Sequence, residues 1–415
     1  MNDSIMNRLE EGFRLMQAGD VARAEQLFLG VLDSDPDNVH ALNLLGMLYV
    51  NNFRPDDAVL CISKAMKLAP KNPESHANLA LAYKDQGKLP RAVEHFRRSI
   101  RLDPNNPMTY NNLGNVLREQ GKPREAIREY EKALKLQPEF GQCWSNFSAA
   151  LNEADQRKAA HRAVNRAIEL EPDLAQAHNN RGDILLAEAR YPEALASYEQ
   201  ATALNPKYTA ALINMARVQR DMDSPEAALG TLQRALQLEP RNPEAHHVRG
   251  VLLEQMGEPK KAADAFQAAI DVAPGMAIAH YYLAQIRGRK TTDAEFDTML
   301  KIWNEVEMLD NDRMFMAFGL ARAHEQRGEF DEAFSYLERG NAIKKKMLPY
   351  DDSDTGEFMN GLVEAASGLA QKLQPGTGCP DSRPVFVLGM PRSGTSLTEQ
   401  MLASHSEVSG CLLYT

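Results

Sequence analysis

Residues 389–396 combine two glycines, three hydroxyl side chains and one arginine in a short segment, GMPRSGTS. The preceding residues 385–388, VFVL, form an apolar and largely β-branched run typical of a buried strand. Residues 396–404 read as a helix that opens on a capping serine. A strand, a glycine-rich turn and a helix N-terminus bring successive backbone N–H groups and the positive helix end to one point. The pattern therefore predicts a phosphate cradle.

The position of the basic residue separates this loop from that of nucleoside triphosphatases. Their loop reads G-x-x-x-x-G-K-[ST], in which Lys meets the terminal phosphates and Ser or Thr binds magnesium. Here Gly389 and Gly394 keep the glycine spacing, but Thr395 replaces the lysine and Arg392 supplies the charge from inside the loop. That exchange favours a group transferred without magnesium, whose charge is met by arginine and hydroxyls.

GMPRSGTSL and the adjoining LTEQMLASH resemble the 5′-phosphosulfate loop of sulfotransferases that use 3′-phosphoadenosine-5′-phosphosulfate (PAPS). The arginine form is similar to the tyrosylprotein sulfotransferase branch and its bacterial relatives, some of which carry helical repeats ahead of the catalytic domain. The resemblance implies that the 5′-phosphosulfate is held by Arg392, Ser393, Gly394, Thr395 and Ser396. It also implies that Arg392 stabilises charge that develops during sulfuryl transfer to a hydroxyl, such as a protein tyrosine.

This resemblance ends soon after His405. The family continues into a G-x-G-E-like segment whose acidic residue acts as general base, whereas Leu412 and Leu413 stand at that place here. The elements that grip the 3′-phosphate and adenine are missing from the sequence, and one strand with one helix cannot enclose a cofactor. We therefore expect residues 384–415 to be the N-terminal fragment of a sulfotransferase domain, from a truncated chain or an interrupted gene, inactive by itself.

Asparagine recurs every 34 residues in the first half of the chain, at Asn78, Asn112, Asn146, Asn180 and Asn214. A carboxamide both donates and accepts hydrogen bonds. A row of carboxamides can therefore pair with the N–H and C=O groups of an extended polypeptide, whatever its side chains are. The same asparagines can instead bond to neighbouring segments of their own chain and serve architecture alone. The sequence leaves both interpretations open.

Histidine also recurs at one position of the 34-residue period, at His76, His178, His246 and His280. Copies of one position in successive helix pairs lie about 10 Å or more apart, whereas the ligands of one zinc ion lie about 2 Å from it. Other copies of this position are Leu42, Tyr110, Trp144 and Leu212. We therefore expect packing residues and no metal site.

The period itself identifies the elements that position these residues. Proline stands at residues 36, 70, 104, 138, 172, 206, 240 and 274. A small residue recurs at Gly12, Gly46, Ala80, Gly114, Ser148, Gly182, Ala216 and Gly250, and alanine at Ala24, Ala58, Ala92, Ala126, Ala160, Ala194, Ala228 and Ala262. This pattern resembles tetratricopeptide (TPR) repeats, pairs of antiparallel helices A and B stacked into a superhelix. Small residues let the two helices approach closely, and proline ends helix B.

The sequence thus predicts an all-α TPR superhelix over residues 5–347, with about ten repeats. The ninth, 277–313, carries a small insertion, and the last, 314–347, is divergent. Residues 348–383 are expected to form a capping helix at 357–373 and a linker. An isolated strand–loop–helix, the start of an α/β sulfotransferase domain, would follow at 384–415.

Helix A lines the concave face of TPR superhelices, so the resemblance places the asparagine row in a groove. The repeats, of which GNVLREQGKPREAIREYEKALKLQP is typical, also resemble those of O-GlcNAc transferases, whose superhelix carries the same ladder. This implies a protein or peptide partner in the groove. An O-GlcNAc transferase itself is disfavoured, because GMPRSGTSL belongs to the sulfotransferase loop.

Composition limits the partners. A net charge of −10 and a pI near 5.6 argue against nucleic acid or an anionic membrane as the general partner. The N-terminus lacks an apolar signal segment, and no apolar stretch is long enough to span a bilayer. The cysteines, Cys61, Cys143, Cys379 and Cys411, show no CxxC spacing, which suits a reducing compartment. We expect a cytoplasmic protein of PAPS-dependent sulfotransferase parentage or, as the alternative, a non-catalytic TPR scaffold.

Overall fold

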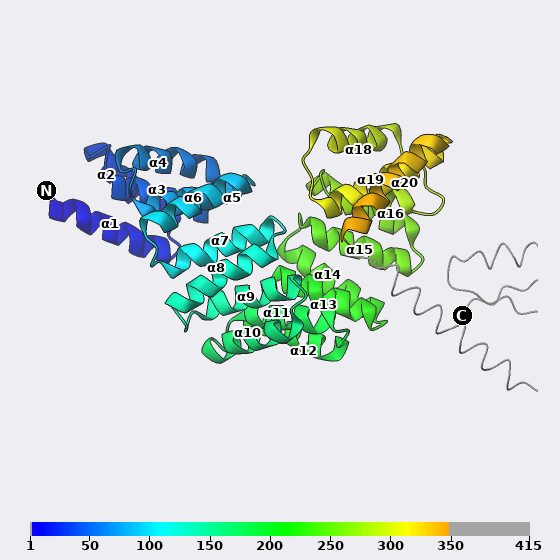
Figure 1. Cartoon of the computed structure of the whole chain (residues 1–415), viewed down its shortest axis with the longest axis horizontal. Helices are drawn as coiled ribbons and strands as arrows, with labels where there is room; N and C mark the ends of the chain where they lie inside the picture. Colours follow the sequence, from blue (N-terminus) through cyan, green and yellow to red (C-terminus); the bar gives the residue numbers. More distant parts are fainter. Residues whose placement is uncertain (1, 348–415) are drawn as a thin grey trace, which may run out of the picture. The chain divides into compact units, whose positions relative to one another are not determined.

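The computed structural model describes residues 2–347, which form α-helices and no strand. The helices alternate along the chain between two sets, A and B (Figure 1). Helices A are α1 (Asn2–Gln17), α3 (Val39–Asn51), α5 (Pro73–Asp85), α7 (Pro107–Glu119), α9 (Gly141–Glu153), α11 (Ala175–Ala187), α13 (Thr209–Asp221), α15 (Pro243–Gln255), α17 (Ala277–Gln285) and α19 (Asp310–Arg327). Helices B are α2 (Val21–Ser34), α4 (Pro55–Leu68), α6 (Leu89–Leu102), α8 (Pro123–Leu136), α10 (Arg157–Leu170), α12 (Tyr191–Leu204), α14 (Pro225–Leu238), α16 (Pro259–Val272), α18 (Asp293–Glu305) and α20 (Phe330–Met347).

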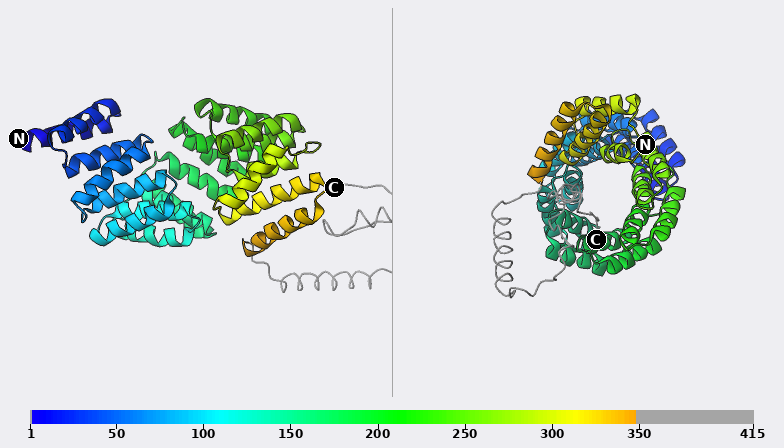
Figure 2. Two further views of the ribbon diagram at one scale, coloured as in Figure 1. Left: turned by 90° about the horizontal axis from the view of Figure 1, so that it is seen from above. Right: turned by 90° about the vertical axis from the view of Figure 1, so that its right-hand side faces the viewer.

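Consecutive helices pack side by side from α1 to α17 (Figure 2). Helices A of neighbouring repeats also touch, as α7 touches α9 and α9 touches α11. Each repeat buries its apolar surface against its neighbours alone. The fold is the TPR solenoid that the 34-residue period predicts. The expected capping helix and the strand–loop–helix of the sulfotransferase fragment lie outside the described residues.

The small residues let helices A and B approach closely, as the sequence predicts. A Cβ atom on Gly114 would lie 2.5 Å from the ring of Tyr130, and one on Gly182 would lie 2.5 Å from the ring of Tyr198. Both rings are fully buried, and so is every alanine that recurs in helix B from Ala24 to Ala262. The aromatic ring of helix B therefore fills the space that glycine leaves in helix A.

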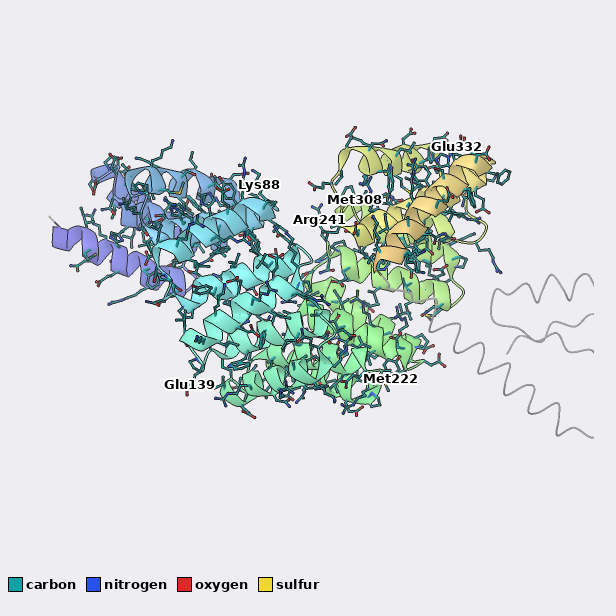
Figure 3. All side chains as sticks on the ribbon, in the orientation of Figure 1. Lys88, Glu139, Met222, Arg241, Met308 and Glu332 are labelled. Atoms are coloured by element: carbon teal, nitrogen blue, oxygen red, sulfur yellow. The ribbon has the colours of Figure 1, made fainter. Side chains whose placement is uncertain are left out.

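The helix ends and connections contribute to the exposed surface of the stack. Lys88, Glu139, Met222 and Arg241 lie at these places and are exposed to solvent (Figure 3). Along residues 2–347, no helix combines the length and the apolar character needed to cross a bilayer.

The ninth and tenth repeats depart from the regular pattern. Helix α17 ends after nine residues, and α18 begins after a loop with a capping box formed by Thr292 and Glu295. Helix α17 packs on α19, and Gly319 of α19 lies beside the backbone of Tyr281. Helix α19 begins at Asp310, ahead of the expected repeat boundary at residue 314.

Helix α20 keeps an exposed apolar face. Phe334 is 62% exposed, whereas Val93 and Ile127, at the corresponding position of helices α6 and α8, are 8% exposed. In those repeats the next helix A packs on helix B. No helix of the described residues does so for α20.

Candidate functional site

The five asparagines of the predicted ladder all lie in helices A, from α5 to α13. Asn146 and Asn180 are buried, with exposed fractions of 4% and 6%. Asn78, Asn112 and Asn214 are half-buried. Their equal spacing in sequence therefore does not give them equal access to solvent.

Three of these asparagines bond to the preceding repeat. The Asn146 amide donates to Asn111 Oδ1 at 2.9 Å. The Asn180 amide donates to the backbone oxygen and to Oγ of Ser145, each at 2.9 Å. The Asn214 amide donates to Asn179 Oδ1 at 3.2 Å. In every case the acceptor stands 35 residues earlier, and we call such a pair a 35-residue joint.

Asn78 and Asn112 are different. No hydrogen bond of their carboxamides is found within the described residues. Asn112 follows Ala77 by 35 residues, and alanine has no side-chain oxygen. Asn78 follows Asn43, whose carboxamide is 5% exposed and has no hydrogen-bond partner among the described residues. Neither of these two ladder carboxamides is therefore hydrogen-bonded to the preceding repeat.

Charged pairs use the same offset near the C-terminal ends of helices A. Lys84 pairs with Glu119 at 3.4 Å, and Arg118 pairs with Glu153 at 2.6 Å. Ion pairs as well as amide hydrogen bonds therefore connect adjacent repeats through residues 35 positions apart.

A second set of hydrogen bonds joins the buried part of the row. The Gln176 amide donates to Asn146 Oδ1 at 2.8 Å, and the Gln142 amide donates to Gln176 Oε1 at 2.5 Å. Further along, Arg217 donates to Asn214 Oδ1 at 3.2 Å and to Glu244 at 2.7 Å. These bonds occupy groups that a peptide backbone would otherwise contact.

Asp183 is the central acceptor of this network. It accepts from the Tyr198 hydroxyl at 2.6 Å, from the Asn214 amide at 3.0 Å and from the Asn179 amide at 3.1 Å. Burial raises the pKa of Asp183 from its ordinary value of 3.8 to about 6, against the opposing effects of the Tyr198 hydrogen bond and of the Arg217 charge. One carboxylate thus connects helices α11, α12 and α13.

The raised pKa predicts a pH-dependent stability. The folded chain holds the Asp183 proton more tightly than the unfolded chain, so the ionised carboxylate costs stability above about pH 6. This cost should disappear as the pH falls through 6 towards 3.8. Urea unfolding at pH 7.5 and pH 5.0 should show the wild type gaining free energy of unfolding relative to Asp183→Asn at the lower pH. Parallel pH profiles for the two proteins would contradict this assignment.

After α13, the residues paired at the 35-residue offset along the row are apolar or aromatic and no longer form carboxamide hydrogen bonds. The next joint pairs Ile213 with Val248, two apolar residues. In the one that follows, the rings of His247 and Tyr282 lie 5.3 Å apart. Tyr281 continues the aromatic contacts to Phe315 at 5.5 Å. The carboxamide part of the row is therefore limited to helices α5 to α13.

The recurring histidines have a structural role. Nε2 of His178, His246 and His280 lies 2.8–2.9 Å from the oxygen of the proline six residues earlier. Trp144 donates to Pro138 in the same way at 2.8 Å. The ring N–H thus satisfies a carbonyl just beyond helix B. Among residues 2–347, no group of three histidine, cysteine, aspartate or glutamate side chains is placed to hold a metal ion.

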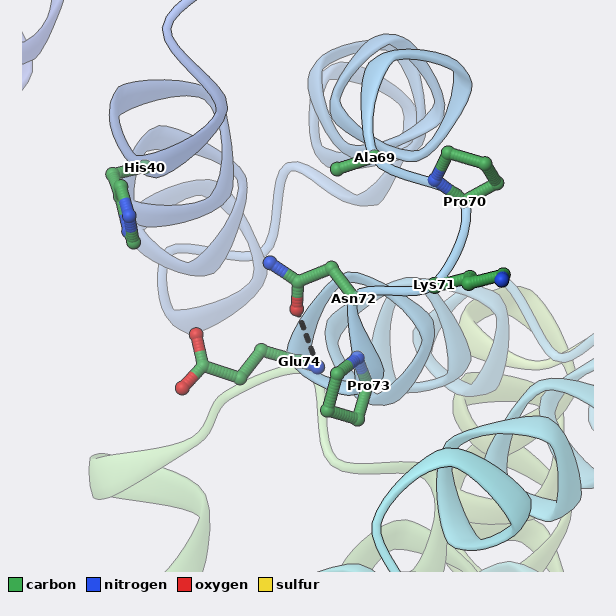
Figure 4. Close-up of a pocket in the computed structure, with 7 residues that line it drawn as sticks. All are labelled: His40, Ala69, Pro70, Lys71, Asn72, Pro73 and Glu74. Carbon is green, nitrogen blue, oxygen red and sulfur yellow. Dashed lines mark hydrogen bonds between the residues drawn. The ribbon is translucent and has the colours of Figure 1, made fainter.

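An open pocket of about 610 Å³ lies near the start of α5, lined by His40 of α3 and by residues 69–74 (Figure 4). Asn72 Oδ1 caps α5 by accepting from the Glu74 N–H at 2.9 Å. Its amide nitrogen points to the side of the pocket where His40 lies (Figure 4). The pocket lies at the start of α5, and Asn112 lies in α7, the helix A of the next repeat.

The predicted phosphosulfate loop, Arg392 to Ser396, lies outside the described residues. Its assignment remains a prediction from the sequence.

Comparisons with known proteins support both parts of the chain. Sequence profiles described as tetratricopeptide repeat or TPR repeat match residues 9–60, 61–94, 81–121, 107–140, 146–209, 185–252 and 249–296. Residues 384–414 match a profile described as the Sulfotransferase family. The repeat matches agree with the helix pairs of the structure, so the described stack is a TPR solenoid.

Two curated relatives match part of this chain. An uncharacterised protein of Aquifex aeolicus (strain VF5) is 35% identical over 119 residues, which are 29% of this chain and 16% of that protein. The probable UDP-N-acetylglucosamine–peptide N-acetylglucosaminyltransferase SPINDLY of Hordeum vulgare is 37% identical over 76 residues, 18% of this chain and 8% of that protein. The chain thus spans a small part of the length of these relatives.

A solved structure shares the fold. The Cut9–Hcn1 hetero-tetramer of the APC/C contains a chain that superposes with a TM-score of 0.52 at 16% identity. The superposition covers 64% of this chain and 52% of that chain. At this identity the likeness shows the solenoid fold alone.

Proposed function

We propose that this chain joins a polypeptide-binding TPR stack to a sulfotransferase domain whose parent activity transfers a sulfuryl group from PAPS to a hydroxyl. The observation that carries the proposal is the match of residues 384–414 to the Sulfotransferase family. That match contains the GMPRSGTSL loop with Arg392. A tyrosine of a polypeptide held by the repeats is the proposed acceptor.

The donor groups of the loop suit a phosphosulfate. PAPS supplies an activated sulfuryl group, whose bond to the phosphate oxygen breaks as a bond to the acceptor oxygen forms. Arg392 would offer a planar, permanently charged set of donors to the anion. The hydroxyls of Ser393, Thr395 and Ser396 add further donors, and Gly394 lets the backbone N–H groups approach.

A transfer assay separates this proposal from its alternative, a TPR scaffold without catalysis. The scaffold is favoured by the observation that residues 2–347 are repeat helices throughout. The full-length protein is incubated with ³⁵S-labelled PAPS and tyrosine-containing peptides. Label on the peptide above a boiled control supports transfer, and label at the control level supports the scaffold.

The polypeptide-binding part of the proposal rests on the carboxamides that the fold leaves open. Asn78 and Asn112 are half-buried and make no hydrogen bond within the described residues, whereas Asn146 and Asn180 bond to the preceding repeat. The open pair can offer both a donor and an acceptor to a peptide backbone. We therefore assign backbone recognition chiefly to Asn78 and Asn112, and inter-repeat cohesion to Asn146 and Asn180.

Two double variants test this division. Asn78→Ala with Asn112→Ala should weaken binding of a peptide selected by phage display on the wild-type chain by about five- to a hundredfold, because each lost hydrogen bond costs about 0.5–1.5 kcal/mol. Its melting temperature should stay close to that of the wild type. Asn146→Ala with Asn180→Ala should lower the melting temperature instead, because buried acceptors lose their donors at about 1–3 kcal/mol each.

Binding is measured by fluorescence anisotropy and melting by circular dichroism on the same samples. The second variant is the matched control, since it removes the same number of carboxamides from the same row. The division of roles is wrong if both variants lose affinity equally at unchanged melting temperature.

A further inference from the structure

An arginine takes a core position in helix α15. The residue before the recurring small residue of helix A is apolar and buried in most repeats, as at Leu45, Leu79, Leu113 and Leu283. In α15 this residue is Arg249, which precedes Gly250. Helix α11 has the same exchange, with Arg181 before Gly182. The two arginines can therefore be compared directly.

Arg181 has an acceptor inside its own repeat. Its Nε donates to Ser197 Oγ, in helix α12, at 3.1 Å. The corresponding residue of the α15–α16 repeat is Ala265, which is fully buried and has no side-chain oxygen. Arg249 Nε is buried without a hydrogen-bond partner. No ion pair of Arg249 occurs within the part of the chain that the structure describes.

Arg249 borders a pocket of about 380 Å³ between α14 and α15. The other lining residues come from α14, and they are Leu229, Gln233, Leu236 and Gln237. None of the lining residues is acidic, so the pocket itself supplies no counter-charge to the guanidinium. Its walls offer two amide side chains, which can donate hydrogen bonds, and two leucines, which can pack against methylene groups.

We propose that this pocket binds a carboxylate side chain of a polypeptide, a glutamate in particular. A guanidinium presents a planar fork of donors that matches a carboxylate in geometry, and one positive charge balances one negative charge. The leucines suit the methylenes of glutamate, and the glutamines suit its remaining oxygen lone pairs. A phosphate dianion would need a second cation, which the lining residues do not provide. This site uses none of the residues of the asparagine row.

The test follows the side-chain Nε–Hε signal of Arg249 by NMR in protein labelled with ¹⁵N-arginine, assigned through its loss in Arg249→Leu. The probe is the capped peptide acetyl-Gly-Glu-Gly-amide, and its neutral control is acetyl-Gly-Gln-Gly-amide. The glutamate peptide should shift the Arg249 signal saturably, with a dissociation constant of about 1–10 mM. The glutamine peptide should bind at least tenfold more weakly.

Two variants and one further probe complete the design. Arg249→Leu restores the residue of the regular repeats, so it should fold and lose the response of neighbouring α14 amides. Arg181→Leu is the matched control and should leave the Arg249 response unchanged. The proposal is overturned if both peptides shift the signal equally, if neither does, or if Arg249→Leu keeps the α14 response. Tighter binding of acetyl-Gly-phosphoSer-Gly-amide or inorganic phosphate than of the glutamate peptide would also overturn the carboxylate assignment.

Discussion

Replacing Arg392 with alanine should lower sulfuryl transfer by the full-length protein about 100- to 1000-fold. Removing one preorganised donor that meets developing charge typically costs this much in turnover. The change should appear in kcat, because the proposed contact strengthens as charge develops. The measurement is the initial rate of ³⁵S transfer to a tyrosine-containing peptide at saturating PAPS.

Arg392→Lys provides the matched control for this prediction. Lysine keeps the charge but loses the planar fork, so it should recover part of the rate. The helical content of both variants should equal that of the wild type, since the loop lies outside the helical repeats at 2–347. Near-normal turnover in Arg392→Ala would remove the loop from the catalytic site.

Replacing Tyr198 with alanine should destabilise the stack by about 3–5 kcal/mol, the usual cost of removing a large buried aromatic side chain. The Tyr198 ring is fully buried against Gly182, and its hydroxyl donates to Asp183 at 2.6 Å. The variant therefore loses both the packing between helices A and B and one donor to the central carboxylate. Urea unfolding followed by circular dichroism measures the loss.

Tyr198→Phe separates the two contributions. It keeps the ring and removes only the hydroxyl, and Asp183 still accepts from Asn214 and Asn179. The loss should therefore be about 1.5–3 kcal/mol, the usual net contribution of one hydrogen bond to a charged group. If the two variants were equally destabilised, the hydrogen bond to Asp183 and not the packing against Gly182 would account for the effect.

The regular part of the fold could be predicted from the sequence because particular residue types recur at fixed positions of the 34-residue period. Glycine at Gly182 and alanine at Ala194 are required by close helix packing, and proline stands just beyond the end of helix B. The ninth repeat could not be predicted in the same way. Helix α17 is short, and it packs on α19 rather than only on the helices next to it in sequence, a contact that the 34-residue period does not encode.

The ladder shows a second limit of sequence reasoning. The positions from Asn78 to Asn214 are visible as a period, but the partner of each asparagine is set by the residue 35 positions earlier. Asn146 and Asn180 meet the oxygens of Asn111 and Ser145, whereas Asn112 meets Ala77. A search for acceptors at this offset separates Asn112 from Asn146 and Asn180, but it does not identify Asn78, because Asn43 has a side-chain oxygen and still makes no hydrogen bond. The raised pKa of Asp183 could not have been found, because it depends on burial within three helices.

The 35-residue joints also limit how such a gene can grow by duplication. A tandem copy of residues 141–174 would place a second Asn146 opposite Ser145, which already accepts an asparagine amide in this protein. The asparagine amide at the new repeat boundary would then have an acceptor without any further mutation. The same segment inserted after residues 209–242 would place its asparagine opposite Ile213, which has no acceptor in its side chain. Such an insertion would lose the side-chain acceptor that Ser145 provides, at a cost of about 0.5–1.5 kcal/mol for the lost hydrogen bond. Repeats of this chain are therefore interchangeable only with neighbours of matching polarity.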